Sequence, residues 1–179
     1  MNAPNIISLA RLLSVPFIVW LILSGHLKAA FLMFLAAGIS DAVDGFIAKR
    51  FGSISRLGHY LDPLADKVLL VAIYVTLGVG GQLPLWLVIL VVSRDFLIVG
   101  GALLSLALDL PYRLQPAVVS KFNTVAQITL AALVLGELAY DLDLAGVTGI
   151  ALWLVAATTV ASGGTYLVDW LKGQPEEAG

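Results

Sequence analysis

Six long apolar stretches divide this chain, and they constrain its fold more than any other feature. They lie near residues 6–25, 29–49, 60–80, 84–108, 115–138 and 144–171. Each has about the 20 residues that a helix needs to cross the hydrocarbon core of a bilayer. The short breaks between them are rich in glycine, serine, proline and aspartate, which favour turns. We therefore expect an all-α integral membrane protein with six transmembrane helices.

The composition agrees with this expectation. Of the 179 residues, 60% are hydrophobic and only 12% are charged, whereas soluble domains carry about 25% charged residues. The length suits a single domain over residues 1–179. There is no cysteine, which excludes disulfides, thiol chemistry and cysteine-bound metals. The first stretch lacks a preceding basic region, so we expect a retained helix and not a cleaved signal peptide.

The basic residues sort by the expected side of the membrane. Seven fall at the N-terminus, in the second and fourth connections or at the C-terminus, namely Arg11, Lys49, Arg50, Arg56, Arg113, Lys121 and Lys172. Only Lys28 falls in a connection of the opposite parity. The positive-inside rule then places both termini in the cytoplasm, or in the matrix of a mitochondrion. For Arg56, Arg113 and Lys172 we favour roles in topology and lipid headgroup contact.

Four aspartates interrupt the second and third stretches. A carboxylate inside a membrane span costs at least about 2.5 kcal/mol, so it normally faces the bundle interior and has a function. Two stripes of helical spacing contain them: Asp41, Asp44, Gly45 and Ala48 recur at i, i+3, i+4 and i+7, and Gly58, Asp62 and Asp66 recur at i, i+4 and i+8. The short connection makes these two helices antiparallel neighbours. The pattern therefore predicts a cavity on which four carboxylates converge.

Divalent cations would remove the repulsion among these carboxylates. Oxygen ligands favour a hard ion, Mg²⁺ first and Mn²⁺ as the alternative. The small residues on the same stripes leave room for a nucleotide. A salt bridge, a proton relay or small-residue packing would each explain one feature, but not two ordered carboxylate pairs. A small cation or proton transporter is a distant alternative, because it too places carboxylates within helices.

The pattern Asp41-x-x-Asp44-Gly45-x-x-Ala48-Lys49, followed after eight residues by Gly58-x-x-x-Asp62-x-x-x-Asp66, resembles the signature of the CDP-alcohol phosphotransferase family. Lys49 stands where the family has arginine. The resemblance implies a six-helix, usually homodimeric fold with its site open to the cytoplasm and the lipid. It implies two divalent cations held by Asp41, Asp44, Asp62 and Asp66, with Asp66 as general base and Asp62 also catalytic. It assigns CDP binding to Asn5, Ser8, Gly45, Ala48, Lys49 and Gly58.

The fifth stretch bears on the acceptor alcohol. Ser120, Asn123, Thr124 and Gln127 recur at i, i+3, i+4 and i+7, beside Lys121. Interhelical hydrogen bonds would explain this stripe, but the segment also resembles family members that make cardiolipin. Members that use glycerol 3-phosphate tend to have a second lysine where this chain has Asn123. A phosphate monoester dianion needs several cations, whereas phosphatidylglycerol offers a neutral glycerol and one diester charge. We therefore expect CDP-diacylglycerol and phosphatidylglycerol as substrates, with phosphatidylglycerophosphate synthesis as the closest rival.

Three further segments carry polar residues. Pro4-Asn5-x-x-Ser8-x-x-Arg11 resembles the same branch of the family, or is a helix cap with an arginine that faces the headgroups. Arg94 binds the acceptor phosphate, or is neutralised by Asp95 or by a neighbouring helix. The last stretch has a polar stripe of Thr158, Ser162, Thr165 and Asp169. The expected acceptor site comprises Lys67, Arg94, Lys121 and Asn123. We expect a bacterial or mitochondrial inner-membrane enzyme and no nucleic-acid partner.

Overall fold

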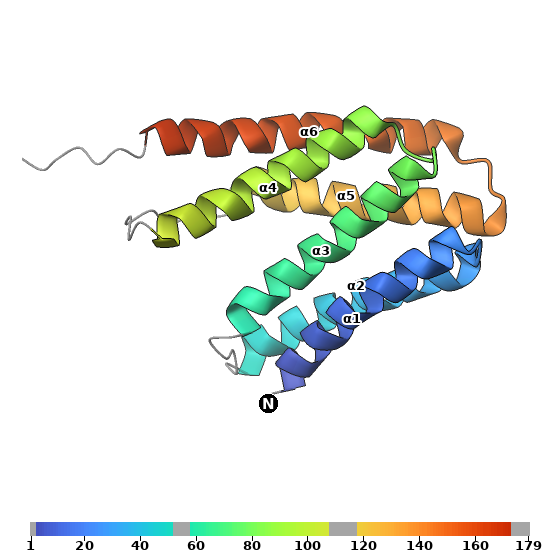
Figure 1. The fold of residues 1–179 in the computed structure, drawn as a ribbon, viewed down its shortest axis with the longest axis horizontal. Coiled ribbons are helices and arrows are strands. Elements are labelled where there is room, and N and C mark those ends of the chain that lie inside the picture. The colour runs from blue at the N-terminus through green and yellow to red at the C-terminus, as the bar shows by residue number, and fades with distance from the viewer. Residues whose placement is uncertain (1–2, 52–57, 108–117, 173–179) are drawn as a thin grey trace, which may run out of the picture. The chain divides into compact units, whose positions relative to one another are not determined.

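The computed structural model describes residues 3–51, 58–107 and 118–172, and it describes side chains within residues 9–40, 67–101 and 119–166. These parts of the chain form helices and no strand (Figure 1). The helices are α1 (Ala3–Leu23), α2 (Leu27–Phe51), α3 (Gly58–Val79), α4 (Leu85–Ala107), α5 (Val118–Tyr140) and α6 (Ala145–Lys172). Each begins and ends within three residues of the stretch expected for it, so the all-helical prediction is confirmed.

Two of the helices are long and apolar enough to cross a membrane over their described side chains. These segments are Val119–Tyr140 and Ala145–Tyr166. Shorter apolar segments are found at Leu9–Leu23, Leu27–Ser40 and Lys67–Val79, in a search confined to the described residues. Six membrane spans therefore remain a prediction.

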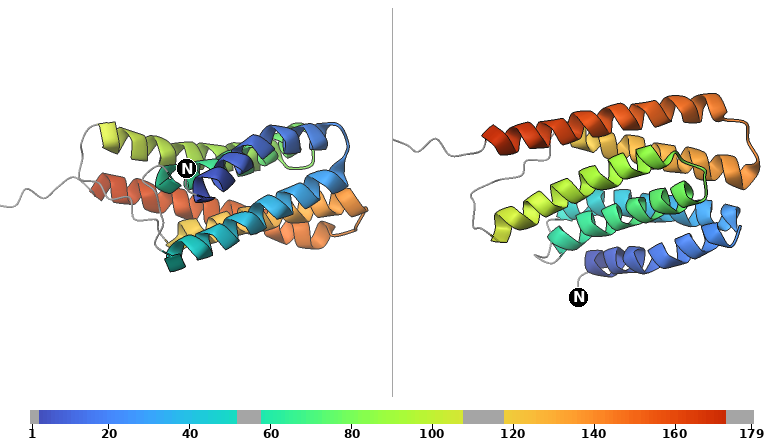
Figure 2. Two further views of the ribbon diagram at one scale, coloured as in Figure 1. Left: turned by 90° about the horizontal axis from the view of Figure 1, so that it is seen from below. Right: turned by 45° about the horizontal axis from the view of Figure 1, so that its top comes forward.

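The chain forms two compact units, and the first contains Met1–Pro84 and Ala131–Ala145. In this unit α1 packs against both α2 and α3. Figures 1 and 2 show that α1 and α3 run in the same direction and that α2 runs in the opposite one. Ile18, Ile73 and Tyr74 are fully buried in its core. A single domain over residues 1–179 stays a prediction.

Three helices of the first unit end in a left-handed cap. Gly25 and Gly81 have φ values of 75° and 73°, and Asp141 has 54°. After each of these residues, an amide donates back across the last turn, as in His26 N–H to the Leu21 carbonyl at 2.9 Å. The Gln82 amide donates in the same way at 2.8 Å. Such caps satisfy terminal carbonyls and turn the chain sharply, so each of the first, third and fifth connections can be short.

The second unit contains Leu85–Leu130 and Gly146–Gly179, which are α4, the first part of α5 and α6. Leu87, Val91, Leu130 and Val155 are fully buried in it. Near the starts of α4 and α6, the rings of Trp86 and Trp153 lie 5.6 Å apart.

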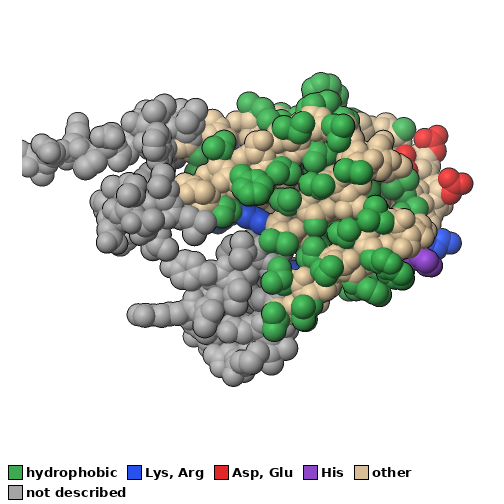
Figure 3. Space-filling view, viewed as in Figure 1, with side chains coloured by type: hydrophobic (Ala, Val, Ile, Leu, Met, Phe, Trp, Pro, Cys, Tyr) green, Lys and Arg blue, Asp and Glu red, His purple; other side chains and the backbone are tan. Residues whose placement is uncertain are grey.

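Much of the described surface is apolar. Side chains of Phe96, Leu97, Ile150 and Trp153 are all about 70% exposed (69–74%). Figure 3 shows hydrophobic side chains spread over much of the described part of the visible face, with the acidic and histidine side chains at one end and basic side chains both there and near the middle of the view. Soluble monomers rarely expose apolar area on this scale, and a lipid environment would cover it.

Candidate functional site

The aspartate motif lies on two helices of the first unit. Asp41 and Asp44 lie in the last three turns of α2, and Asp62 and Asp66 lie in the first turns of α3. Gly58 is the first residue of α3. The side chains of the aspartates, and those of Asn5, Ser8, Ala48 and Lys49, lie outside the described residues. The predicted metal and CDP ligands therefore stay predictions.

The buried positions of α2 and α3 show the register in which these aspartates occur. On α2, Ala30 and Phe34 are buried, and Asp41 follows Phe34 by seven residues, which is two helical turns. On α3, Leu70 and Ile73 are buried, and Asp66 precedes them by four and seven residues. In sequence spacing, Asp41 and Asp66 thus fall in register with these buried positions, and the inward orientation of the four aspartates stays a prediction.

On α1, the buried stripe includes a charged residue. Arg11, Val15, Ile18 and Leu21 are all buried, at i, i+4, i+7 and i+10. The side chain of Arg11 is only 5% exposed. The interpretation of Arg11 as an arginine that faces the headgroups is therefore wrong. Lys67, the predicted acceptor ligand on α3, is half-buried.

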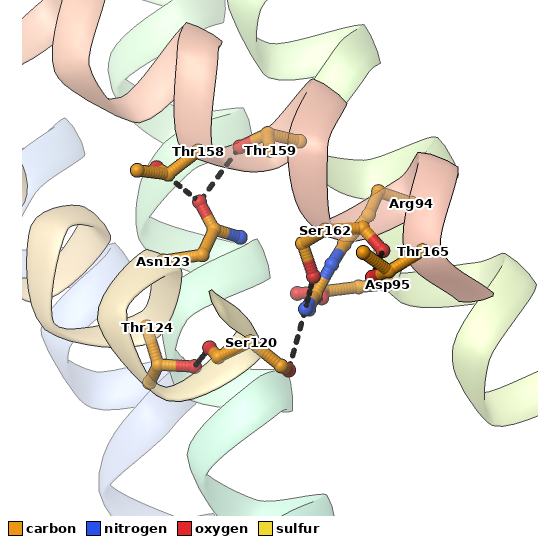
Figure 4. Close-up of polar contacts among 9 residues, drawn as sticks. All are labelled: Arg94, Asp95, Ser120, Asn123, Thr124, Thr158, Thr159, Ser162 and Thr165. Carbon is orange, nitrogen blue, oxygen red and sulfur yellow. Dashed lines mark hydrogen bonds and ion pairs between the residues drawn. The ribbon is translucent and has the colours of Figure 1, made fainter. Parts of the chain in front are cut away.

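In the second unit, Arg94 joins three helices (Figure 4). It lies on α4 and is 3% exposed. Its Nη1 donates to Asp95 Oδ1 at 2.6 Å, and its Nη2 donates to Ser120 Oγ on α5 at 2.6 Å and to Ser162 Oγ on α6 at 2.5 Å. The ring of Tyr166 lies 5.9 Å from the guanidinium carbon. The predicted neutralising pair of Arg94 and Asp95 is confirmed.

Asn123 forms a second link between α5 and α6. It is fully buried, and its Oδ1 accepts hydrogen bonds from Thr158 Oγ1 and Thr159 Oγ1, both at 2.9 Å. Its Nδ2 is buried and has no hydrogen-bond partner within the described part of the chain. Asn123 therefore has one amide group available to a further acceptor oxygen.

The polar stripe of α5 faces the interior, as predicted. Asn123 and Gln127 are buried, and Ser120 and Thr124 are half-buried. The bonds of Asn123 and Ser120 to other helices confirm the interhelical role as well. Lys121, by contrast, is exposed.

Sequence reasoning missed two members of this polar cluster on α6. Thr159 binds Asn123, and Tyr166 lies over Arg94. Thr159 adjoins the predicted Thr158, so the hydroxyl pair was a signal, but no spacing pointed to Tyr166. The predicted Thr165 donates to the Ser162 carbonyl of its own helix at 2.8 Å. The side chain of Asp169 lies outside the described residues.

The described side chains include no group of three His, Asp or Glu residues that would hold a metal ion. The second unit instead offers hydroxyls, amides and one compensated ion pair, which suit a polar but weakly charged ligand. The aspartate motif of the first unit, whose side chains lie outside the described residues, stays the predicted metal site.

Comparisons with known proteins agree with the sequence pattern. A CDP-alcohol phosphatidyltransferase family model matches residues 1–161. The chain is 35% identical over 93% of its length to a cardiolipin synthase (CMP-forming) / mitochondrial hydrolase fusion protein of Schizosaccharomyces pombe, of which it spans 30%. It is 36% identical over 98% of its length to a chloroplastic CDP-diacylglycerol–glycerol-3-phosphate 3-phosphatidyltransferase of Oryza sativa, of which it spans 59%.

A third relative matches the chain almost from end to end. It is the CDP-diacylglycerol–glycerol-3-phosphate 3-phosphatidyltransferase of Bacillus subtilis, which is 33% identical over 92% of this chain and 93% of its own length. The family model and this full-length match agree with the aspartate motif on α2 and α3. The chain therefore belongs to the CDP-alcohol phosphatidyltransferase family.

Proposed function

We propose that this protein is a cardiolipin synthase of the inner membrane. It transfers a phosphatidyl group from CDP-diacylglycerol to phosphatidylglycerol and releases CMP. Membership of the family supports the reaction type. The observation that carries the choice of acceptor is the charge balance of the polar cluster on α4, α5 and α6.

The helix lengths and the apolar surface support a membrane setting. The six helices have 21 to 28 residues each, and about 20 suffice to cross the hydrocarbon core. Exposed side chains such as Ile89 and Phe96 give these helices apolar outer faces. We infer six spans, with both termini and the aspartate motif toward the cytoplasm or matrix. The functional form is proposed to be a homodimer.

The donor site is proposed to lie where the stripes of α1, α2 and α3 converge. The spacing of Asp41 from the buried Phe34 and of Asp66 from the buried Leu70 and Ile73 supports convergence of the aspartates on one cavity. The carboxylate oxygens of these aspartates suit hard divalent cations such as Mg²⁺. The chain has no cysteine that would favour a softer ion. Two such ions, when bound, would neutralise the diphosphate and stabilise CMP as leaving group.

The chain's own groups then complete the reaction. Asp66 accepts the proton of the attacking hydroxyl. The hydroxyl oxygen attacks the phosphorus that bears the diacylglycerol, and the phosphoanhydride bond to CMP breaks with its electron pair on CMP. Gly45 and Gly58 leave room for the nucleotide, and the side chains of Asn5, Ser8, Ala48 and Lys49 are proposed to contact it.

Within the second unit, the acceptor site is proposed to include Arg94, Lys121 and Asn123, and the assignment of Lys67 in the first unit to the acceptor stays a prediction. Arg94 already has its charge compensated by Asp95 at 2.6 Å. Asn123 adds a neutral amide beside two threonine hydroxyls. Such a set suits the glycerol hydroxyls and single diester charge of phosphatidylglycerol, because a phosphate dianion would need further cations.

Glycerol 3-phosphate is the second candidate acceptor. The rice and Bacillus subtilis relatives, at 36% and 33% identity, are named for that substrate. An assay of the purified protein with Mg²⁺ and CDP-diacylglycerol, offered each acceptor separately, decides between the two. We expect cardiolipin and CMP from phosphatidylglycerol. Product from glycerol 3-phosphate alone would refute the proposed acceptor but leave the family reaction intact.

A further inference from the structure

Thr159 on α6 differs from most other threonines of the described helices in where its hydroxyl donates. Four of them donate to the carbonyl four residues earlier in their own helix, at 2.6–3.1 Å, namely Thr76, Thr124, Thr129 and Thr158. Thr159 is buried, and its hydroxyl donates across to Asn123 Oδ1 on α5 at 2.9 Å. A hydroxyl has one hydrogen to donate. The hydrogen of Thr159 is therefore committed to Asn123.

The orientation of the Asn123 amide is set by the donors that its oxygen accepts. Oδ1 accepts from the hydroxyls of Thr158 and Thr159, both at 2.9 Å. Thr158 is the weaker partner, because its hydrogen is shared with two carbonyls of its own helix at 2.8 and 3.2 Å. In Figure 4 the amide nitrogen points away from both threonines and toward the side of the cluster where Arg94 lies. Thr159 thus decides which end of the amide faces that side.

Two buried donor groups of this unit, Asn123 Nδ2 and Arg94 Nε, have no hydrogen-bond partner among the described residues. Both are N–H groups, which donate and do not accept. Buried N–H groups are normally satisfied, so this pair indicates a ligand that brings oxygen atoms. The glycerol hydroxyls and the phosphodiester of a lipid acceptor offer such oxygens. An Asn123 amide turned by 180° would present its carbonyl oxygen instead, which would repel the phosphodiester oxygens.

We propose that Thr159 is a positioning residue of the acceptor site, whose hydroxyl holds Asn123 Oδ1 and thereby aims Nδ2 at an oxygen of the acceptor. This inference rests on the proposed function. Without the Thr159 hydroxyl, the amide can turn about its last torsion, because Thr158 can accept from Nδ2 while it donates to the Leu154 carbonyl of its own helix. The acceptor would then meet the amide in two orientations, and its binding would weaken.

The test is Thr159→Val, which keeps the shape of the side chain and removes its hydroxyl. We expect kcat/KM for the acceptor to fall about 3- to 10-fold, mainly through KM, as for one lost neutral hydrogen bond. The KM for CDP-diacylglycerol should change less than about twofold, because no donor contact is altered. Thr159→Ser keeps the hydroxyl and should restore the acceptor kinetics. Thr129→Val is the matched control, because the exposed Thr129 donates to the Val125 carbonyl of its own helix at 2.8 Å, and it should match the wild type.

A double-mutant cycle with Asn123→Met separates positioning from a structural role. In the Asn123→Met background, Thr159→Val should cause no further loss of kcat/KM for the acceptor, because no amide remains to be held. An equal loss in both backgrounds would overturn the inference, and so would wild-type acceptor kinetics in a folded Thr159→Val.

Two further outcomes are distinguishable. If Thr159→Val does not fold, Thr159→Ala also lacks the hydroxyl, and wild-type acceptor kinetics in that variant would overturn the inference equally. The cycle is measured with the acceptor that the wild type uses, so an error in the proposed acceptor does not affect it. A wild type that transfers to neither phosphatidylglycerol nor glycerol 3-phosphate would defeat the proposed function, and the inference with it.

Discussion

Asn123 shows how one side chain can set the charge of a site. Its oxygen is occupied by two threonine hydroxyls, and its buried Nδ2 has no partner among the described residues. An unsatisfied buried donor costs about 1–3 kcal/mol, so a ligand oxygen that reaches it would be favoured. A lysine at this position would instead place a full charge between α5 and α6. Substitution of Asn123 therefore tests which acceptor the protein uses.

Asn123→Lys should move preference toward glycerol 3-phosphate. The added cation would bind the phosphate dianion of glycerol 3-phosphate. The variant would also lose the amide contact to the neutral glycerol of phosphatidylglycerol. We expect the ratio of kcat/KM values, glycerol 3-phosphate over phosphatidylglycerol, to rise about 10-fold or more, as for one charge-assisted contact. Asn123→Met is the control, because it removes the amide without adding charge. It should not raise the ratio of kcat/KM for glycerol 3-phosphate over that for phosphatidylglycerol to the same extent. An unchanged ratio in a folded, active Asn123→Lys would contradict the role.

Asp66→Asn should separate binding from chemistry. Loss of the base should lower kcat by about 10²–10⁴-fold, whereas CDP with Mg²⁺ should still raise the Tm. Asp41→Ala and Asp62→Ala should lose both turnover and bound metal, measured by elemental analysis. Turnover preserved in Asp66→Asn would show that another group takes the proton.

At the scale of the helices, the second unit is tied together by hydrogen bonds between polar side chains as well as by apolar packing. Arg94 and Asn123 each bond to α6, and Arg94 also bonds to α5. These bonds depend on the charge of Arg94 being compensated inside the unit. The compensation comes from the next residue along α4, Asp95.

Asp95→Ala should destabilise the protein strongly, because it leaves the buried Arg94 without its carboxylate. Breaking a buried pair in this way costs about 3–5 kcal/mol. The double variant Arg94→Met/Asp95→Ala should recover part of that loss, since no uncompensated charge remains. The free energy of unfolding, measured by denaturant titration in detergent, gives both values. A double variant no more stable than Asp95→Ala would argue against charge compensation.

The positions of the helices could be predicted from the sequence, because the length of an apolar stretch and the turn residues at its ends are local features of the chain. Gly25 and Gly81 marked helix ends and do adopt positive φ, and the stripe from Ser120 to Gln127 faces inward by its spacing alone. The burial of Arg11 did not follow, because an arginine near a helix start is compatible with headgroups or with a core. Only the packing of α1 against α2 and α3 decides between them. The partners of Asn123 likewise depend on how α6 meets α5.

At the scale of the whole molecule, the charges of the connections predict which side of the membrane each connection faces. The first, third and fifth connections belong to the first unit. Lys28 and Phe31 of α2 contact Tyr140 of α5, so the first and fifth connections lie at one end of that unit. Acidic Asp141 and Asp143 are at this end, and most basic residues belong to the other connections and the termini. The positive-inside rule predicts that this end is the outer one.

Single cysteines test this topology on a clean background, because the chain has none of its own. Ser24→Cys, Gln82→Cys and Leu142→Cys place a thiol at exposed positions of the three outer connections. They should react with a membrane-impermeant maleimide in right-side-out vesicles. Ser53→Cys and Ala178→Cys should react only in inside-out vesicles, because a charged reagent does not cross the hydrocarbon core. The reverse pattern would invert the protein and move the aspartate motif, with its nucleotide substrate, to the outer side.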